Sequence, residues 1–302
     1  MALRWSIYGP SRDILLQTES DVGGESLNWK PVYITTERGT FECFVSGKGK
    51  PICTAHLYQE FTDKGNPFIN VLSDYYEVIA VNLKGAGKSS KPLRKSDLSM
   101  DETVKDLESI RTSMNYSKWS YAGHSTGGFL GLKYATLADE HLEALILSGT
   151  AASREFQNSE KCLYNFKSGQ YRKEMGKLWF FMMMPFKSQK IRARHRLLEL
   201  SLFHPEKYNE YFNDEIGSGV VGKRMRAYIQ DLKTYDVREH LKRINLPTLV
   251  LCGRHDVQCP IENSIEINSL MPNSDLVIFE GSNHFPFIEE AVEFRKAIRS
   301  FA

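Results

Sequence analysis

The G-x-S-x-G segment at 123–127 lies between a short apolar run and a longer one. The run before it, 119–122, predicts a strand, and the run after it, 129–137, is long enough for a buried helix. A serine at such a junction predicts a nucleophile elbow, a sharp turn that presents the Ser125 side chain. Flanking glycines let neighbouring backbone pass close by, and the helix start favours negative charge beside the serine. A Gly/Ser turn without chemistry is the alternative, so the rest of the chain decides.

Strand-like and helical segments alternate on both sides of this motif. The further predicted strands cover 31–36, 40–45, 51–55, 76–81, 142–147, 248–252 and 274–279. The further predicted helices cover 68–75, 100–114, 261–270 and 286–301. Such alternation favours a mostly parallel sheet with helices on both faces. The first two strands form a hairpin that turns at Arg38 and Gly39.

The composition changes after Gly149. Residues 151–235 are rich in Lys, Arg, Phe, Tyr and Met and have a helical pattern. We expect them to form a helical lid inserted into a core made of 30–150 and 236–302. Residues 1–29 show no clear periodicity, and the sequence assigns this arm no role. A chain of 302 residues suits one large domain that carries such an insertion.

The charge balance limits the classes of partner. The chain carries 39 Lys and Arg against 37 Asp and Glu, and it has no long block of like charge. We therefore expect neither a nucleic acid nor a membrane as partner. No apolar run reaches the length of a membrane span. The sequence leaves the oligomeric state open.

The cysteines and the first residues indicate a reducing compartment. The five cysteines are widely spaced and odd in number, and no C-x-x-C pair occurs, so neither a disulfide framework nor a zinc site is predicted. The stretch from Met1 to Asp13 mixes Arg, Ser, Tyr and Asp and lacks the apolar centre of a signal peptide. We expect free thiols and a cytoplasmic protein.

A glycine-rich loop at 82–89 ends in Gly-Lys-Ser, as phosphate-binding loops do. The first glycine that G-x-x-x-x-G-K-[ST] requires is replaced by Asn82, and the third glycine of a dinucleotide fingerprint is replaced by Ser90. We therefore expect a tight turn that leads to the next helix, and no nucleotide site.

Three polar residues follow predicted strands in the order Ser125, Asp256, His284. A serine is a weak nucleophile unless a base takes its proton, and the base needs a carboxylate that fixes its tautomer. The carboxyl ends of parallel strands meet at one edge of a sheet, where ligands bind. We expect Ser125 as nucleophile, His284 as base and Asp256 as the orienting acid. A turn-capping Asp256 and a plain loop His284 are the alternatives.

With these residues in place, the sequence resembles the α/β-hydrolase superfamily, in particular its proline iminopeptidase and small-molecule esterase members. The similarity rests on motifs at 83–89, 123–128, 253–256 and 281–286 and spans about residues 31–302. It implies an α/β-hydrolase fold, a mostly parallel sheet flanked by helices with an inserted helical lid, and a Ser-His-Asp triad without a cofactor. No H-E-x-x-H or comparable cluster predicts a metal site.

One segment departs from the family pattern. After its third strand the family carries His-Gly-Gly-Pro-Gly or His-Gly-x, whereas this chain has His56, Leu57 and Tyr58. An oxyanion hole needs backbone N–H groups aimed at the developing charge. The N–H of Thr126 should supply one. The resemblance implies Tyr58 for the other, with Leu57 as the lesser alternative.

The most apolar stretch of the chain, 178–186, lies in the predicted lid. It can be a helix buried inside the lid, or its apolar side can roof the active site, and the two arrangements are compatible. We expect Leu57, Trp179, Phe180 and Met183 to contact the substrate.

The expected function is hydrolysis of a small ester or related acyl compound through an acyl-enzyme on Ser125. The alternative within the family is an aminopeptidase that removes N-terminal proline and holds the substrate amine with lid carboxylates. The alternative of another class is a non-catalytic binding protein, since a fold alone does not settle activity. All three triad positions are present, which favours an enzyme acting on a small molecule.

Overall fold

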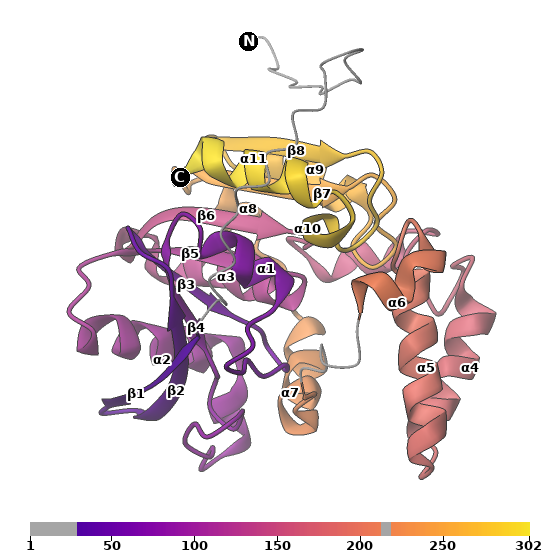
Figure 1. Cartoon of the computed structure of the whole chain (residues 1–302), viewed down its shortest axis with the longest axis horizontal. Coiled ribbons are helices and arrows are strands. Elements are labelled where there is room, and N and C mark those ends of the chain that lie inside the picture. The colour runs from indigo at the N-terminus through magenta and orange to yellow at the C-terminus, as the bar shows by residue number, and fades with distance from the viewer. Residues whose placement is uncertain (1–28, 213–218) are drawn as a thin grey trace.

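The computed structural model describes residues 29–212 and 219–302, and its centre is an eight-stranded sheet (Figure 1). The strands are β1 (Lys30–Thr36), β2 (Gly39–Ser46), β3 (Pro51–Ala55), β4 (Glu77–Val81), β5 (Trp119–His124), β6 (Leu142–Ser148), β7 (Thr248–Gly253) and β8 (Ser274–Phe279). Their order is β1-β2-β4-β3-β5-β6-β7-β8. β1, β2 and β4 pair antiparallel, and the neighbours from β4 to β8 pair parallel. The predicted mostly parallel sheet with a leading hairpin is confirmed.

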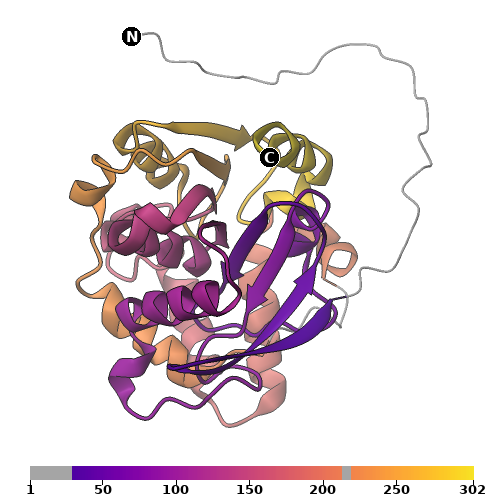
Figure 2. The ribbon, with the colours of Figure 1, turned by 90° about the vertical axis from the view of Figure 1, so that its left-hand side faces the viewer.

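Helices cover both faces of this sheet (Figure 2). They are α1 (Pro67–Leu72), α2 (Met100–Ser113), α3 (Thr126–Ala138), α8 (Arg238–Leu241), α9 (Ile261–Leu270), α10 (Pro286–Glu289) and α11 (Ala291–Phe301). Successive strand residues point to opposite faces. Cys53 therefore packs with α2 and α3, whereas its neighbour Ile52 packs with α1 and α11. The fold has two apolar layers with the sheet between them.

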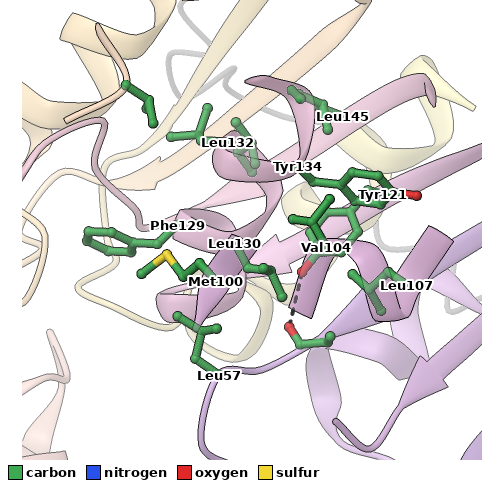
Figure 3. Close-up of a cluster of buried hydrophobic side chains, with 14 of the residues drawn as sticks. Leu57, Met100, Val104, Leu107, Tyr121, Phe129, Leu130, Leu132, Tyr134 and Leu145 are labelled. Atoms are coloured by element: carbon green, nitrogen blue, oxygen red, sulfur yellow. Dashed lines mark hydrogen bonds between the residues drawn. The ribbon is translucent and has the colours of Figure 1, made fainter. Parts of the chain in front are cut away.

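The larger apolar cluster joins the sheet to α2 and α3 (Figure 3). Leu107 from α2 and Leu130 from α3 meet Tyr121 and Leu145 from the strands there. The buried Tyr121 hydroxyl lies 3.0 Å from the carbonyl oxygen of Gly127, to which it donates. The bond pairs both polar groups inside the core, and it holds the first turn of α3 in a fixed position relative to β5.

Between β6 and β7 the chain leaves the sheet, and we call residues 151–235 the cap. Its helices are α4 (Arg172–Met183), α5 (Lys187–Leu200), α6 (Tyr208–Tyr211) and α7 (Gly222–Leu232). α4 and α5 form a hairpin that projects away from the sheet, while α7 lies beside the β1–β4 side of the molecule (Figure 1). An antiparallel bridge joins Gln59 to Val220.

The last predicted helix is broken into α10 and α11. The break falls at Glu290, which has φ −128° and ψ 53°. Its carboxylate accepts hydrogen bonds from the Gly281 N–H at 2.9 Å and the Ser282 hydroxyl at 2.6 Å. The expected continuous helix at 286–301 is therefore wrong at this point, because Glu290 turns back to hold the loop after β8.

The N-terminal arm is described only at its last residue, Trp29. Trp29 is buried in the cluster beneath α1, and its Nε1 donates to Asn70 Oδ1 at 2.9 Å. Trp29 therefore belongs to the core, which corrects the predicted boundary by one residue. Residues 1–28 lie outside the described part of the chain.

Candidate active site

The elbow forms where β5 runs into α3. Ser125 has φ 53° and ψ −122°, a backbone conformation that is strained for a residue with a side chain. A Cβ on Gly123 would lie 2.3 Å from the carbonyl carbon of Gly127, and a Cβ on Gly127 would lie 2.5 Å from the oxygen of Ala55. The glycines of the motif are therefore required by close backbone packing. The Ser125 side chain stays partly exposed.

The loops after β7 and β8 bring Asp256 and His284 together. Asp256 Oδ2 lies 2.9 Å from His284 Nδ1, and both side chains are buried. Asp256 Oδ1 accepts from the N–H groups of Gln258 and Cys259, each at 2.8 Å. An ionised carboxylate only accepts, so we assign the imidazole proton to Nδ1, and Nε2 keeps a free lone pair.

The end of β6 lies between this pair and the elbow. The Ser125 N–H donates to the Ser148 carbonyl at 2.9 Å. The next residue, Gly149, has φ 53°, and a Cβ there would lie 3.0 Å from Asp256 Oδ2 and 3.2 Å from His284 Nδ1. All three predicted triad residues therefore adjoin Ser148, the last residue of β6, or Gly149, which follows it.

His124 links the serine and histidine loops. Its Nε2 donates to the carbonyl oxygen of His284 at 2.8 Å, and the two ring centroids are 4.6 Å apart. Burial, with a smaller repulsion from His284, holds the pKa of His124 well below its ordinary value. The imidazole is therefore neutral and acts as a hydrogen-bond donor next to Ser125.

The end of α5 holds the same loops from the cap side. The Ser201 carbonyl accepts from the His284 N–H at 3.1 Å, and its hydroxyl accepts from Gln258 Nε2 at 2.9 Å. The Leu200 carbonyl accepts from Asn283 Nδ2 at 3.2 Å. The cap therefore contributes directly to the position of the histidine and aspartate loops, a role the sequence analysis does not assign to it.

His56 connects the two segments expected to bind an oxyanion. Its Nδ1 accepts from the Gln59 N–H at 3.1 Å and from the Tyr58 N–H at 3.3 Å. Its Nε2 lies 3.1 Å from Thr126 Oγ1, to which it donates because the ring proton is on this nitrogen. Burial lowers the pKa of His56 to about 3, with smaller effects of His284 and Arg224. The ring is neutral and fixes both segments.

These contacts change the roles expected for Leu57 and Tyr58. The Tyr58 N–H shares the Nδ1 lone pair of His56 with Gln59. Within the described residues the N–H groups of Leu57 and Thr126 have no protein acceptor. The Leu57 side chain is only 2% exposed and lies in the core cluster, so the expectation that it contacts substrate is wrong.

Arg224 of α7 is a buried cation that the sequence analysis does not single out. Its Nε donates to the Leu57 carbonyl at 2.7 Å, its Nη1 to the Lys84 carbonyl at 2.9 Å and its Nη2 to Thr103 Oγ1 at 3.0 Å. Burial lowers the pKa of Arg224 to about 10. The charge is retained at neutral pH, and the guanidinium fastens α7 to the loop after β3.

The structure leaves three predicted substrate contacts in solvent. Trp179, Phe180 and Met183 are 45%, 60% and 75% exposed on α4. The predicted burial of these three side chains, either inside the cap or as a roof over Ser125, is therefore not observed. A helix with apolar residues on several sides cannot bury all of them against one neighbouring helix.

The glycine-rich loop at 82–89 binds the protein's own carboxylates. The Gly87 N–H donates to Glu60 Oε1 and the Lys88 N–H to Glu42 Oε2, both at 2.9 Å. In a nucleotide-binding loop such N–H groups face phosphate oxygens. In this chain the N–H groups of Gly87 and Lys88 bind carboxylates of the protein itself, which agrees with the expected tight turn.

Residues 29–212 and 219–302 contain no group of three or more His, Cys, Asp or Glu side chains that could hold a metal ion. Among the same residues, no helix is long and apolar enough to cross a membrane.

The sheet order, the helices on both faces and the serine at a strand-to-helix turn define an α/β-hydrolase. The family model for the alpha/beta hydrolase fold matches residues 57–291, and the chain belongs to this family. A proline iminopeptidase of Heyndrickxia coagulans is 26% identical over 278 residues, which cover 89% of this chain and 96% of that protein.

Two further relatives are also hydrolases. The 2-hydroxy-6-oxo-6-(2'-aminophenyl)hexa-2,4-dienoic acid hydrolase of Metapseudomonas resinovorans is 25% identical over 261 residues, 85% of each protein. A solved alpha/beta fold family hydrolase from Bacillus anthracis strain Sterne has a TM-score of 0.88 and 38% identity, covering 91% of this chain and 100% of that one. The protein is therefore an α/β-hydrolase enzyme.

Proposed function

We propose that the protein hydrolyses a small ester or related acyl compound through an acyl-enzyme on Ser125. The observation that carries the proposal is the buried Asp256–His284 pair, 2.9 Å apart, beside the β6 end that also anchors the elbow. The family match supports hydrolysis in general.

In this mechanism His284 Nε2 takes the Ser125 hydroxyl proton as Oγ attacks the carbonyl carbon. Asp256 holds the Nδ1–H tautomer and stabilises the imidazolium that forms. The negative oxygen is held by the N–H of Thr126 and by an N–H of the Leu57–Tyr58 segment. His284 then protonates the leaving alcohol, and the same base activates a water that releases the acid.

The cap carboxylates argue against binding a free amine, as an aminopeptidase must. Three of them already pair with arginine, in the bridges Glu155–Arg238, Glu174–Arg196 and Glu199–Arg196, and Glu206 contacts His204 Nδ1 at 3.0 Å. Glu160 and Glu210 are exposed, and Asp214 and Glu215 lie outside the described residues. We therefore favour an ester over an N-terminal prolyl peptide. The five cysteines are free and buried, which supports the proposed cytoplasmic location.

A fluorophosphonate probe tests the nucleophile. We expect labelling and p-nitrophenyl ester turnover in the wild type, and loss of both in Ser125→Ala. Ser113→Ala is the matched control, because Ser113 is exposed on α2. Normal turnover in purified Ser125→Ala would refute the assignment. Faster turnover of proline-naphthylamide than of every ester in a panel would favour the aminopeptidase.

A further inference from the structure

In the part of the chain that the structure describes, the α4–α5 hairpin packs against the rest of the protein at its base. Met175, Leu178 and Ala193 pack there against Leu163 and Val257. At a rise of about 1.5 Å per residue, the 12 residues of α4 extend about 18 Å. The far end of the hairpin, around the turn between the two helices, points away from the sheet (Figure 1).

The outer part of this hairpin exposes large apolar side chains. They are Trp179, Phe180, Phe181, Met183, Phe186 and Ile191, each at least 40% exposed. Among the described residues these side chains are only partly covered, and the rings of Phe180 and Phe181 contact each other with centroids 5.8 Å apart. Contiguous apolar patches are uncommon on monomer surfaces and mark interaction sites.

Positive charge runs along the hairpin that carries this apolar end, with Lys187 and Lys190 next to the turn. From Arg172 to Arg196 the chain carries eight Lys and Arg residues against one Glu, whereas the whole chain carries 39 against 37. Five of these cations are exposed and have no salt bridge within the described residues: Lys173, Lys177, Lys187, Lys190 and Arg192. Lys173, Lys177 and Phe180 follow each other at helical spacing, so cations and apolar residues share one side of α4.

We propose that the outer end of the α4–α5 hairpin docks the protein onto an anionic lipid surface. Aromatic and Met side chains enter the boundary between headgroups and acyl chains, and the flanking lysines and arginines stay at the level of the anionic headgroups. The long Lys side chains reach outward while their stems cover apolar surface. Docking of this kind uses none of the residues proposed for catalysis.

The charge pattern separates this partner from two others. A second copy would bring two strongly positive hairpin ends together, which like-charge repulsion opposes. A nucleic acid would use the cations but would leave the apolar residues at the very end uncovered. A lipid surface is complementary to both features. The expectation of no membrane partner rests on the net charge of the whole chain. That sum does not reveal the local excess of positive charge on the hairpin.

Trp179 is a natural reporter for the experiment. Trp29 and Trp119 are buried, and Trp5 lies outside the described residues, so the wild type minus Trp179→Phe difference spectrum isolates Trp179. We expect its emission to shift to the blue with vesicles of phosphatidylcholine plus phosphatidylglycerol. Brominated lipid should quench it, and high salt should weaken the binding.

Two double variants test the cationic part and the apolar part of the hairpin surface separately. Lys187→Glu with Lys190→Glu should weaken vesicle binding at least about tenfold and leave turnover of a soluble ester unchanged. Lys48→Glu with Lys50→Glu is the matched control, because these exposed lysines lie in the turn between β2 and β3. Phe180→Ala with Phe186→Ala should abolish the blue shift, whereas Leu93→Ala, at a residue that is 95% exposed, should not.

The Trp179 difference spectrum also shows the outcomes that would overturn the proposal. A Trp179 emission unchanged by anionic vesicles, or shifted equally by pure phosphatidylcholine, would refute it. An emission already blue without vesicles would show that the chain covers its own hairpin, and a shift that grows with protein concentration would assign the surface to a second copy. An equal shift with single-stranded DNA would assign it to nucleic acid.

Discussion

Arg224 Nε donates to the carbonyl oxygen of Leu57 at 2.7 Å, and this bond joins the last helix of the cap to the loop that follows β3. The two residues are 167 positions apart in the chain. The Tyr58 carbonyl accepts from the Val221 N–H at 2.8 Å, so α7 holds this loop at a second point. The backbone proposed to bind the oxyanion is therefore positioned by the cap as well as by the sheet.

Replacing Arg224 by Ala should lower both stability and kcat. The carbonyls of Leu57 and Lys84 lose their donor inside the protein, and each unsatisfied group costs about 1–3 kcal/mol. Denaturant unfolding and ester kinetics measure the two effects. Arg226→Ala, at an exposed position on the same helix, is the control. If Arg224→Lys, which keeps the charge but loses the fork, retains wild-type kcat, the proposed role in positioning the loop is wrong.

Replacing Asp256 by Asn should reduce kcat by about 10⁴-fold with little change in fold. The amide cannot hold the Nδ1–H tautomer of His284 as a carboxylate does. Ester kinetics check the loss, and circular dichroism checks the fold. The control is Asp275→Asn, which removes an exposed carboxylate at the start of β8, the opposite end of the strand from the His284 loop. A loss smaller than tenfold would contradict the triad.

Replacing Gly149 by Ala should impair catalysis without changing any residue of the proposed triad. The added Cβ would lie 3.0 Å from Asp256 Oδ2, and φ 53° disfavours alanine. A small displacement of reacting groups lowers rates by about 100-fold. The matched control is Gly176→Ala on α4, where a Cβ meets nothing within 4 Å and helix propensity should rise. Equal kcat values for the two variants would show that the space beside the pair is not critical.

The neutral His56 makes stability depend on pH. Its pKa of about 3 in the folded protein lies below the unfolded value of about 6.5, so below pH 6.5 the unfolded chain takes up a proton that the folded one does not. The folded state therefore loses stability as the pH falls from 6.5 towards 3. Between pH 7 and pH 5 we expect the wild type to lose about 1–2 kcal/mol more than His56→Asn in urea unfolding.

The control for that measurement is His240→Asn, at an exposed position. It should leave the wild-type pH dependence in place. If His56→Asn and the wild type have parallel profiles between pH 7 and pH 5, His56 is protonated in the folded protein, and the assigned bonds to Tyr58, Gln59 and Thr126 are wrong.

The parts of the site that follow strands were predictable, because local pattern determines them. Ser125 and its glycines form one motif, and Asp256 and His284 follow the last two strands of an alternating chain. The fold class came from the same alternation. Contacts between segments that are far apart in the chain leave no local pattern in the sequence. Arg224 is one of 39 basic residues, and nothing in its neighbours indicates burial.

The exposed end of α4 shows a second limit of prediction from sequence. Apolar content around Trp179 and Met183 predicts burial, and on average that inference is sound. It fails here because α5 and the hairpin base cover only one side of the helix. Composition tells how much apolar surface a segment has, and the arrangement of its neighbours decides how much of it is covered.

The bonds from the Ser201 carbonyl to the His284 N–H and from Arg224 to the Leu57 carbonyl have a consequence for engineering. A cap inserted between β6 and β7 invites the view that it is an exchangeable module. In this chain, excising it would remove an acceptor from the histidine loop and the guanidinium from the loop after β3. A truncated core would lose its catalytic alignment along with its cover, and chimeras need their crossover points outside the segments that contain Ser201 and Arg224.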